Sequence, residues 1–260
     1  MERVALVTGA ARGIGAATTA ALAAEGYHVL AVDACADDPS IPYRQGSREE
    51  LDAAVAAAGP KAAAAVADAT DIEAMAEVVA RAERDHGGLD VIVAAAGVIA
   101  GGVPQWELAR EQEQAVIDVC LGGALTASRV GIPALLRRPR PRSGRFLAVG
   151  STAAVRGLPM LAAYCAAKAG VIGLVRALAV ELRGTGITAN AVNPGSTRTA
   201  TLDESARLYG LTSAEQFSQQ HAIERLLEPE EVAAALVFLA GVHADGITGA
   251  ALPVDGGLSI

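Results

Sequence analysis

The sequence predicts a single α/β domain over residues 1–260, in which a doubly wound, seven-stranded parallel sheet carries helices on both faces. Short apolar runs typical of buried strands alternate with helix-length segments, and no Pro/Ser-rich linker divides the chain. Glycines and polar residues follow these runs, which is where open α/β sheets bind ligands. The composition, 52% hydrophobic but only 3% aromatic, describes a core of small aliphatic side chains suited to close helix-on-sheet packing.

The first strand is predicted at residues 3–7, and it leads directly into the glycine-rich segment of residues 8–15 and a helix to about residue 25. Glycine lets a backbone turn tightly and approach a pyrophosphate, and the N–H groups at a helix start attract that anion. A strand, a glycine-rich turn, a helix and a second strand in this order indicate a dinucleotide site. The residues of this segment that we expect at the cofactor are Gly9, Arg12, Gly13, Ile14 and Gly15.

The second strand, residues 28–32, ends at Asp33, which lies eighteen residues beyond Gly15. A carboxylate here can accept hydrogen bonds from the adenosine ribose and would repel a 2′-phosphate, so we expect NAD rather than NADP. Two alternatives stay open. Arg12 could tolerate a phosphate, and Asp33 could simply cap the loop that follows.

The connection after Asp33 is long: about fourteen residues precede a helix that begins near Ser47, where two to six are usual. Two prolines and a glycine keep it irregular, beside the adenosine end of the expected cofactor site. Ile41 and Tyr43 could fold this insertion down onto the domain. A harmless surface insertion is the alternative.

The third and fourth strands are expected at residues 61–67 and 90–95. Asp68 could hydrogen-bond adenine, and a glycine after the fourth strand would let the backbone approach the cofactor. A long helix is expected over about residues 107–136, and the basic run from Arg137 to Arg145 is more typical of a solvated loop than of a site for an anionic partner. The candidate cofactor residues of this part are Asp68, Ala69, Ala95 and Gly97.

The fifth strand leads to Ser151, and the helix that follows carries Tyr164 and Lys168 four residues apart, on one helix face. An adjacent ammonium should lower the pKa of the phenol from its reference of about 10, so that the phenol can exchange a proton near neutrality. The three side chains suit proton transfer to or from the oxygen of an alcohol or carbonyl. A capping serine and a chance Tyr-x-x-x-Lys spacing are the alternatives.

A sixth strand, residues 187–192, is followed by a segment that should form a lid over the substrate, at about residues 196–227. A helix starting near residue 228 and a last strand at residues 250–254 complete the sheet. The lid and neighbouring segments offer an apolar lining typical of a medium-sized apolar alcohol such as a terpenoid or fatty alcohol. Candidate substrate residues are Val98, Thr152, Leu158, Leu202 and Tyr209, with Ile99, Met160, Leu208, Leu211 and Phe217 as further apolar lining.

Composition excludes several function classes. The net charge of −8 argues against a nucleic-acid partner. Cys35, Cys120 and Cys165 are too widely spaced for a disulfide framework or a metal site, so we expect reduced thiols and no metal. We see no apolar run of about 18 residues without polar breaks and no signal sequence, so we expect a cytoplasmic protein without a membrane span.

With these residues identified, the chain resembles the short-chain dehydrogenase/reductase family over essentially its whole length. The resemblance implies a Rossmann fold and an active enzyme with Tyr164 as acid/base and Ser151 steadying the substrate oxygen. It also implies that Lys168 holds the nicotinamide ribose and lowers the phenol pKa, and that family members are often homotetramers built on the helices around residues 116–136 and 164–182. Further residues that match the family at the cofactor are Pro194, Gly195, Thr197 and Thr199.

The chain departs from the family pattern at two places. The usual Asn-Asn-Ala-Gly after the fourth strand is replaced by three alanines and Gly97, and the family's fourth catalytic residue, an Asn, is replaced by Cys120. A thiol is a poor substitute for an amide that holds a proton-relay water, although a backbone carbonyl could still hold it, so we expect a working but slower enzyme.

The insertion after Asp33 resembles that of the mycofactocin-associated branch of the family. This similarity implies NAD that stays bound and is reoxidised in place by a redox peptide. The predicted function is NAD-dependent interconversion of an alcohol and its ketone or aldehyde. A 3-oxoacyl-thioester reductase is the alternative within the enzyme class, and a non-catalytic dinucleotide-binding scaffold, suggested by Cys120, is the alternative outside it.

Overall fold

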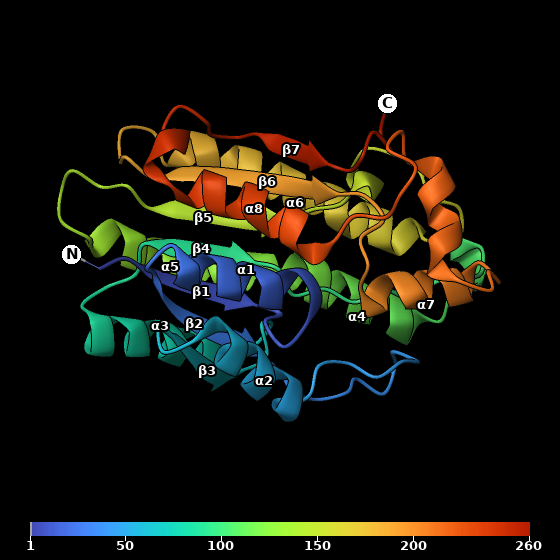
Figure 1. Ribbon diagram of the computed structural model, residues 1–260, viewed down its shortest axis with the longest axis horizontal. Helices are drawn as coiled ribbons and strands as arrows, with labels where there is room; N and C mark the ends of the chain where they lie inside the picture. The colour runs from blue at the N-terminus through green and yellow to red at the C-terminus, as the bar shows by residue number, and fades with distance from the viewer. Residues whose placement is uncertain (1) are drawn as a thin grey trace.

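A computed structural model describes residues 2–260 and contains one parallel sheet of seven strands in the order β3-β2-β1-β4-β5-β6-β7 (Figure 1). Strand order reverses between β1 and β4, so this is the doubly wound sheet that the sequence predicts. The strands are β1 (Val4–Thr8), β2 (His28–Asp33), β3 (Ala62–Val66), β4 (Val91–Ala94), β5 (Arg145–Val149), β6 (Thr188–Pro194) and β7 (Ala251–Val254).

Helices cover both faces of the sheet, and each face has its own apolar core (Figure 1). The first face carries α1 (Gly13–Ala24), α2 (Arg48–Ala58) and α8 (Pro229–Ala240). The second face carries α3 (Ile72–His86), α5 (Gly123–Arg137) and α6 (Ala162–Glu181). Two further helices, α4 (Arg110–Ile117) and α7 (Ala200–Leu208), lie beyond the end of the sheet.

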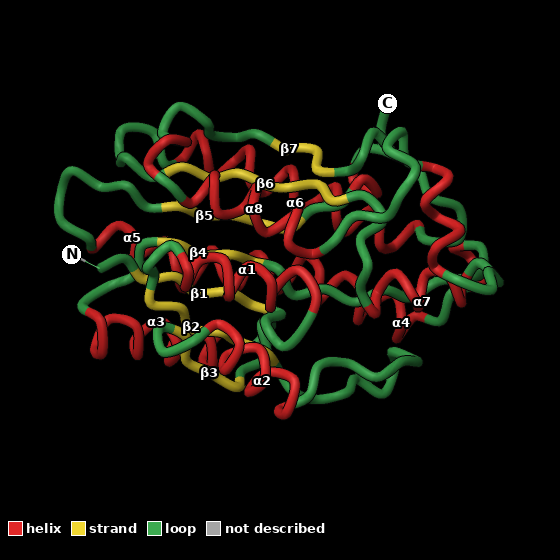
Figure 2. Tube along the Cα trace, viewed as in Figure 1, coloured by secondary structure: helices red, strands yellow, loops and turns green. Residues whose placement is uncertain are grey.

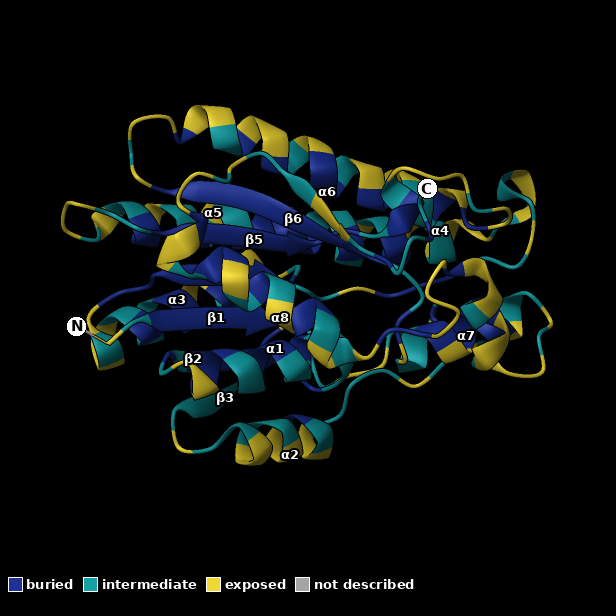
Figure 3. Ribbon diagram, turned by 45° about the horizontal axis from the view of Figure 1, so that its top comes forward, coloured by how far each residue is buried: buried dark blue, intermediate teal, exposed yellow. Residues whose placement is uncertain are grey.

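Burial follows from this layering. The strands β1, β4 and β5 are buried at every residue because helices cover them on both sides (Figure 3). The outer faces of α2 and α6 are exposed. Small residues bring a helix close to the sheet: a Cβ added at Gly131 of α5 would lie 2.1 Å from Cδ1 of Ile92 in β4.

The long helix predicted over residues 107–136 is interrupted. A short 3-10 turn, Gln105–Glu107, precedes α4, and a π-helical turn, Asp118–Gly122, joins α4 to α5. A π turn inside a helix often marks a functional site, because it re-aims the side chains that follow. Cys120 lies in this turn.

Two helical stretches, Arg110–Arg137 and Ala162–Glu181, are long and apolar enough to cross a membrane by length and composition alone. Both stretches nevertheless contain polar breaks, among them Arg129 in the first and Lys168 in the second. Their apolar residues contribute to the core on the second face of the sheet, where α5 and α6 pack. Buried core helices can be as long and as apolar as membrane-spanning helices, so length and composition alone do not indicate a membrane span.

The basic run after α5 is more structured than predicted. Arg138 Nε donates to Asp90 Oδ1 at 2.8 Å, and Arg137 Nε donates to Glu83 Oε1 at 2.7 Å. Arg145 is fully buried and pairs with Asp245. These ion pairs hold the loop to the body of the domain, so part of the run serves the fold.

Because all seven strands are parallel, their carboxyl ends meet at one rim, to which the arrows of Figure 1 point and where loops gather in Figure 2. The loops after β1, β2, β4, β5 and β6 emerge there, together with α4 and α7. This rim positions every segment that the sequence marks as functional.

Candidate active site

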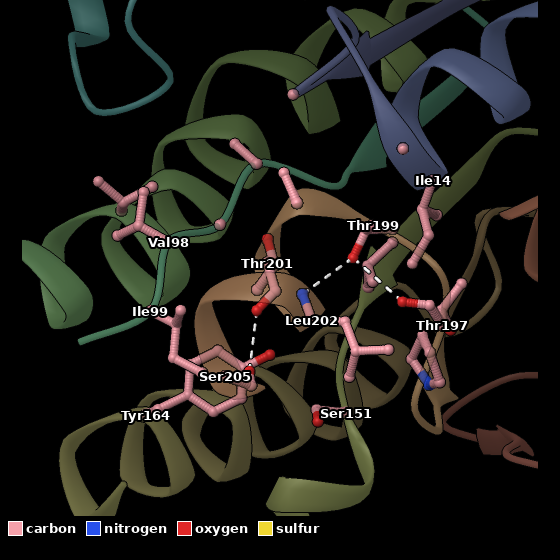
Figure 4. A pocket seen from close by; sticks show the side chains of 18 of the residues that line it. Ile14, Val98, Ile99, Ser151, Tyr164, Thr197, Thr199, Thr201, Leu202 and Ser205 are labelled. Atoms are coloured by element: carbon pink, nitrogen blue, oxygen red, sulfur yellow. Dashed lines mark hydrogen bonds between the residues drawn. The ribbon is translucent and has the colours of Figure 1, made fainter. Parts of the chain in front are cut away.

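A cavity of about 930 Å³ runs along this rim. Its wall includes every predicted cofactor and substrate residue named above except Leu208 and Met160, and every predicted catalytic residue except Cys120. Figure 4 shows one part of it, with Tyr164 and Ser151 on one side, Val98 and Ile99 on another, and Thr197, Thr199 and Leu202 opposite. The site is therefore built from segments far apart in the sequence.

The glycine-rich turn after β1 forms a cradle that side chains would fill. Gly9 has φ +66°, and a Cβ there would lie 2.8 Å from Cα of Ala96. A Cβ on Gly15 would lie 2.0 Å from the carbonyl oxygen of Gly9. Thr8 Oγ1 accepts from the N–H of Ala95 at 3.1 Å, so the turns after β1 and β4 are tied together. The start of α1 is thus left open to an anionic group.

Asp33 lies in the cavity wall at the end of β2 and also organises the loop behind it. Its Oδ2 accepts from the N–H of Ala11 and its Oδ1 from the N–H of Cys35, each at 3.1 Å. The loop-capping alternative and the cavity-lining prediction therefore both hold. Asp68 also lines the cavity, and its Oδ1 accepts from Thr70.

The insertion after Asp33 packs against the body of the domain, so the alternative of a harmless surface insertion does not hold. Ile41 is 5% exposed, and Ile41 and Tyr43 pack in one cluster with Val98 and Tyr164. The hydroxyl of Tyr43 accepts from the N–H of Ile99 at 3.1 Å, which joins the insertion to the loop after β4. Burial raises the pKa of Tyr43 to about 12, so this phenol stays protonated at neutral pH. The insertion, residues 34–47, is called the strap below.

Gln45 of the strap was not predicted as a site residue. Its backbone N–H donates to Asp37 Oδ1 at 2.7 Å, while its side-chain Nε2 is buried in the cavity wall without a hydrogen-bond partner. A buried amide donor left unpaired costs about 1–3 kcal/mol, which a polar ligand in the cavity would recover. In the sequence, only its place between Arg44 and Gly46 of the strap marks Gln45, and that signal is weak.

The three catalytic candidates converge on the same cavity from β5 and α6. Ser151 follows β5, and its Oγ accepts from the N–H of Ala153 at 3.1 Å. Tyr164 and Lys168 lie one turn apart on α6, whose small residues let it pack closely. Lys168 is 3% exposed and its Nζ donates to the carbonyl oxygen of Val149 at 2.8 Å.

The predicted lowering of the Tyr164 pKa is not what the structure gives. Burial raises the pKa of Tyr164, the nearby Cys120 thiol adds to the rise, and a hydrogen bond with Ser151 opposes it. Lys168 Nζ lies 5.7 Å from the centre of the Tyr164 ring and is committed to Val149. Helical spacing correctly places the two residues together, but it does not aim the ammonium at the phenolic oxygen.

Cys120 lies behind the cavity wall rather than in it. It is 2% exposed, and its Sγ donates to the carbonyl oxygen of Val98 at 3.2 Å. A Cβ added at Gly97 would lie 3.5 Å from Lys168 Nζ and 3.6 Å from Cys120 Sγ. The thiol is therefore separated from the lysine by little more than a glycine, and its one donor is used by the Val98 carbonyl oxygen.

The lid begins and ends at one place. Arg198 N–H donates to the carbonyl oxygen of Leu227 at 2.8 Å, and Leu227 N–H donates to Ser196 at 3.0 Å. Between these ends, Leu202 and Tyr209 line the cavity, and the Tyr209 hydroxyl donates to the carbonyl oxygen of Pro159 at 2.8 Å. The lid is thus fastened to the loop that precedes α6.

Two predicted lining residues face elsewhere. Leu208 packs beside Gly102, where an added Cβ would lie 3.2 Å from its Cδ2. Met160 is partly exposed, and its carbonyl oxygen accepts from the N–H of Gly102 at 3.1 Å. Both residues hold the loop after β4 instead of lining the cavity.

At the nicotinamide end of the predicted cofactor site, the backbone of Gly195 packs closely against the backbone of Asp255. A Cβ on Gly195 would lie 2.7 Å from the carbonyl oxygen of Asp255. Thr197 Oγ1 donates to Gly195 at 3.0 Å, and Thr199 caps α7 by accepting from Leu202. Together with the glycine cradle, Asp33 and the unpartnered Gln45 amide, these features fit an extended dinucleotide. Across residues 2–260, no group of three or more His, Cys, Asp or Glu side chains is placed to hold a metal ion.

Comparison with known proteins agrees with this geometry. The sequence model of a family described as Enoyl-(Acyl carrier protein) reductase matches residues 9–259. Cis-4-hydroxycyclohexanecarboxylate dehydrogenase of Sinomonas cyclohexanicum is 38% identical, over 98% of this chain and 96% of its own. 2,3-dihydro-2,3-dihydroxybenzoate dehydrogenase of Bacillus subtilis is 34% identical, over 99% and 96%. The crystal structure of carveol dehydrogenase from Mycobacterium avium in complex with NAD superposes with a TM-score of 0.92 at 31% identity, covering 98% of this chain and 97% of that one.

Proposed function

Because the chain belongs to the short-chain dehydrogenase/reductase family and is an NAD-dependent oxidoreductase, we propose that it interconverts a secondary alcohol on a mainly apolar ring with its ketone. The observation that supports this most directly is the convergence of Ser151, Tyr164 and Lys168 on the cavity that also contains the glycine cradle. Proton transfer and hydride transfer need these two parts side by side.

In the oxidising direction, the carbinol C–H bond breaks and its hydrogen leaves with two electrons, while the hydroxyl proton leaves separately and a C=O bond forms. NAD supplies the acceptor for the hydride when it is bound. Tyr164 takes the hydroxyl proton, and Ser151 holds the same oxygen. Lys168 is fixed by Val149 beside the phenol, where its charge stabilises the phenolate that proton release requires.

The substrate body is inferred from the lining and from the relatives. Val98, Ile99, Leu158 and Leu202 give the substrate end an apolar wall, with the Tyr209 ring above it. The three relatives described above are named for alcohols carried on a six-membered carbon ring. A compact ring alcohol, such as a monocyclic terpenoid, suits both observations.

We further propose that NAD is held tightly and reoxidised in place by a redox peptide of the mycofactocin type. The strap supports this: Tyr43 joins it to the loop after β4, and both segments line the cavity, so we expect their contact to slow the release of a bound dinucleotide. Gln45 adds an unpaired donor on the inner side.

The chain is also proposed to act as a homotetramer. Leu125 of α5 and Val180 of α6 are 46% and 63% exposed, which leaves apolar residues on the outer sides of both helices. Light scattering would test the assembly, and a monomer at assay concentration would contradict it.

The activity is tested with the wild type and Tyr164→Phe, which keeps the ring but removes the hydroxyl. A panel of ring alcohols is assayed with added NAD and, separately, with an artificial electron acceptor. We expect the wild type to oxidise at least one alcohol and the variant to lose at least about 10²-fold in kcat, the usual scale for a general base. Equal rates in both proteins would exclude Tyr164 as the base.

Cofactor retention is tested by denaturing freshly purified protein and measuring NAD(H) by mass spectrometry. We expect close to one NAD(H) per chain in both the wild type and Tyr164→Phe. Protein that is empty and turns over readily with added NAD would refute retention. Dinucleotide bound without turnover of any alcohol would favour the scaffold alternative.

A further inference from the structure

The cavity carries opposite charges at its two ends. The carboxylates in its wall follow β2 and β3, on one side of β1 in the sheet. The substrate end is built from the loops after β5 and β6 and from the C-terminal segment, on the other side of β1. The acidic wall residues are Asp33, Asp37, Asp38 and Asp68, and they outnumber the one basic residue that the cavity wall has at this end, Arg12.

At the substrate end, the charged side chains in the wall are Lys168 and Arg156. Lys168 is buried and bound to Val149, beside the catalytic phenol. Arg156 lies in the loop between Ser151 and Tyr164, so it is carried by the same segment as the catalytic residues. No carboxylate of residues 2–260 lines this end of the cavity or forms an ion pair with Arg156, in a protein that carries a net charge of −8.

A backbone carbonyl orients the Arg156 guanidinium, and no carboxylate of the described residues pairs with its charge. Its Nη1 donates to the carbonyl oxygen of Leu258. Leu258 lies in a turn held by Asp255, whose Oδ1 accepts from the N–H of Gly257 at 2.9 Å and whose Oδ2 accepts from the N–H of Ser259 at 3.1 Å. A guanidinium has five N–H donors, so most of this group stays free for a planar, two-oxygen acceptor.

The backbone of Arg156 lies near the start of the catalytic helix, because Sγ of Cys165, the residue after Tyr164, donates to the Arg156 carbonyl oxygen at 3.8 Å. Five residues span at most about 18 Å when extended, and the 3-10 turn Thr152–Ala154 shortens the path from Ser151 to Arg156. A substrate whose hydroxyl lies at Tyr164 and whose far end reaches the cavity mouth would therefore bring that end towards Arg156.

We propose that Arg156 determines substrate specificity by binding a carboxylate, so that the preferred substrates are apolar ring alcohols with an anionic carboxylate on the far side of the ring from the hydroxyl. This inference rests on the proposed alcohol dehydrogenase function. Arg156 touches the substrate away from the reacting carbon, so it should act on KM more than on kcat.

The test compares cis-4-hydroxycyclohexanecarboxylate with its carboxamide, which has nearly the same shape but no charge. Both are assayed with the wild type, Arg156→Gln and Arg156→Lys, using an artificial electron acceptor. Arg176→Gln is the control, because it removes the same charge from an exposed site on α6 at the other end of the domain.

We expect the wild type to prefer the carboxylate by about tenfold in kcat/KM, mostly through KM, a modest value because Arg156 is exposed to water. Arg156→Gln should abolish this preference while leaving turnover of the carboxamide within about twofold. Arg156→Lys should keep part of the preference, and Arg176→Gln should keep all of it. A preference that survives in Arg156→Gln, or wild type that oxidises both compounds equally, would overturn the proposal.

A binding measurement distinguishes failure of the carboxylate site from failure of the proposed dehydrogenase function. The carboxylate and the carboxamide are each titrated into NAD-loaded protein in a calorimeter. If no alcohol is oxidised, yet wild type binds the carboxylate more tightly than the carboxamide and Arg156→Gln does not, the carboxylate site stands and the dehydrogenase function falls. If the carboxamide and other neutral ring alcohols are oxidised but the carboxylate has no binding advantage, the carboxylate site falls alone.

Discussion

The ammonium of Lys168 lies 5.7 Å from the centre of the Tyr164 ring and donates its hydrogen bond to the main chain at Val149 instead of to the phenol. The lysine therefore lies over the ring of the phenol and is not hydrogen-bonded to its oxygen. Burial is the largest influence on the phenol and raises the pKa of Tyr164. If Tyr164 is the acid/base, as we propose, its burial sets the pH at which it exchanges a proton.

The raised pKa gives the two reaction directions different pH dependences. Oxidation needs the phenolate, which is scarce at neutral pH when the pKa of Tyr164 is raised, so kcat for oxidation should rise about tenfold per pH unit above neutrality until another step limits it. Reduction needs the protonated phenol and should stay level over the same range. Steady-state pH profiles from pH 6 to 10 check this. An oxidation rate independent of pH would contradict it.

The strap makes a second prediction through Tyr43. Tyr43→Phe keeps the buried ring but removes the acceptor for the Ile99 N–H. One such hydrogen bond contributes about 0.5–1.5 kcal/mol, so bound NAD should dissociate about two- to tenfold faster. Dissociation is measured on protein loaded with NADH, by trapping the released cofactor and following the change in its fluorescence. Tyr27→Phe, at a hydroxyl far from the cavity, is the control, and equal release from Tyr43→Phe and wild type would show that this bond does not retain the cofactor.

The parts of this site that could be predicted from the sequence are those whose residues lie close together along the chain. The glycine cradle and Asp33 follow from local signals, because a strand, its turn and the next helix lie together in sequence. The pairing of Tyr164 with Lys168 follows from helix geometry alone. Parallel strand order then brings these separate segments to one rim.

The contacts that could not be predicted join distant residues. Tyr43 meets Ile99 across 56 positions, and nothing in either segment specifies the partner. The π turn at Asp118–Gly122 is rich in poor helix formers, including Gly122, but such residues do not distinguish a π turn from any other weak point in a helix. The predicted shift of the Tyr164 pKa was in the wrong direction. Helical spacing indicates a neighbouring charge, but it does not show how deeply the phenol is buried.

Asp33 should control the choice of dinucleotide. Asp33→Asn removes the charge and keeps one of the two oxygens that accept from the loop N–H groups of Ala11 and Cys35. Without repulsion of a 2′-phosphate, kcat/KM with NADP should rise by about tenfold or more. Asp33→Ala should also use NADP better but melt at a lower temperature, since two N–H groups lose their acceptor. If Asp33→Asn remains as selective for NAD as wild type, the carboxylate is only a loop cap.

Cys120 offers the last prediction, because it stands where the family has an amide. Its thiol donates to the Val98 carbonyl, behind Gly97 and close to Lys168. Cys120→Asn would add two donors and an acceptor there, able to hold a water against the lysine. The stabilisation of the transition state should be that of about one hydrogen bond, so kcat should rise about two- to tenfold. Cys120→Ala removes the thiol without adding an amide and should leave kcat near wild type. A change below about twofold in Cys120→Asn, with thermal stability preserved, would show that proton transfer in this enzyme does not pass through this position.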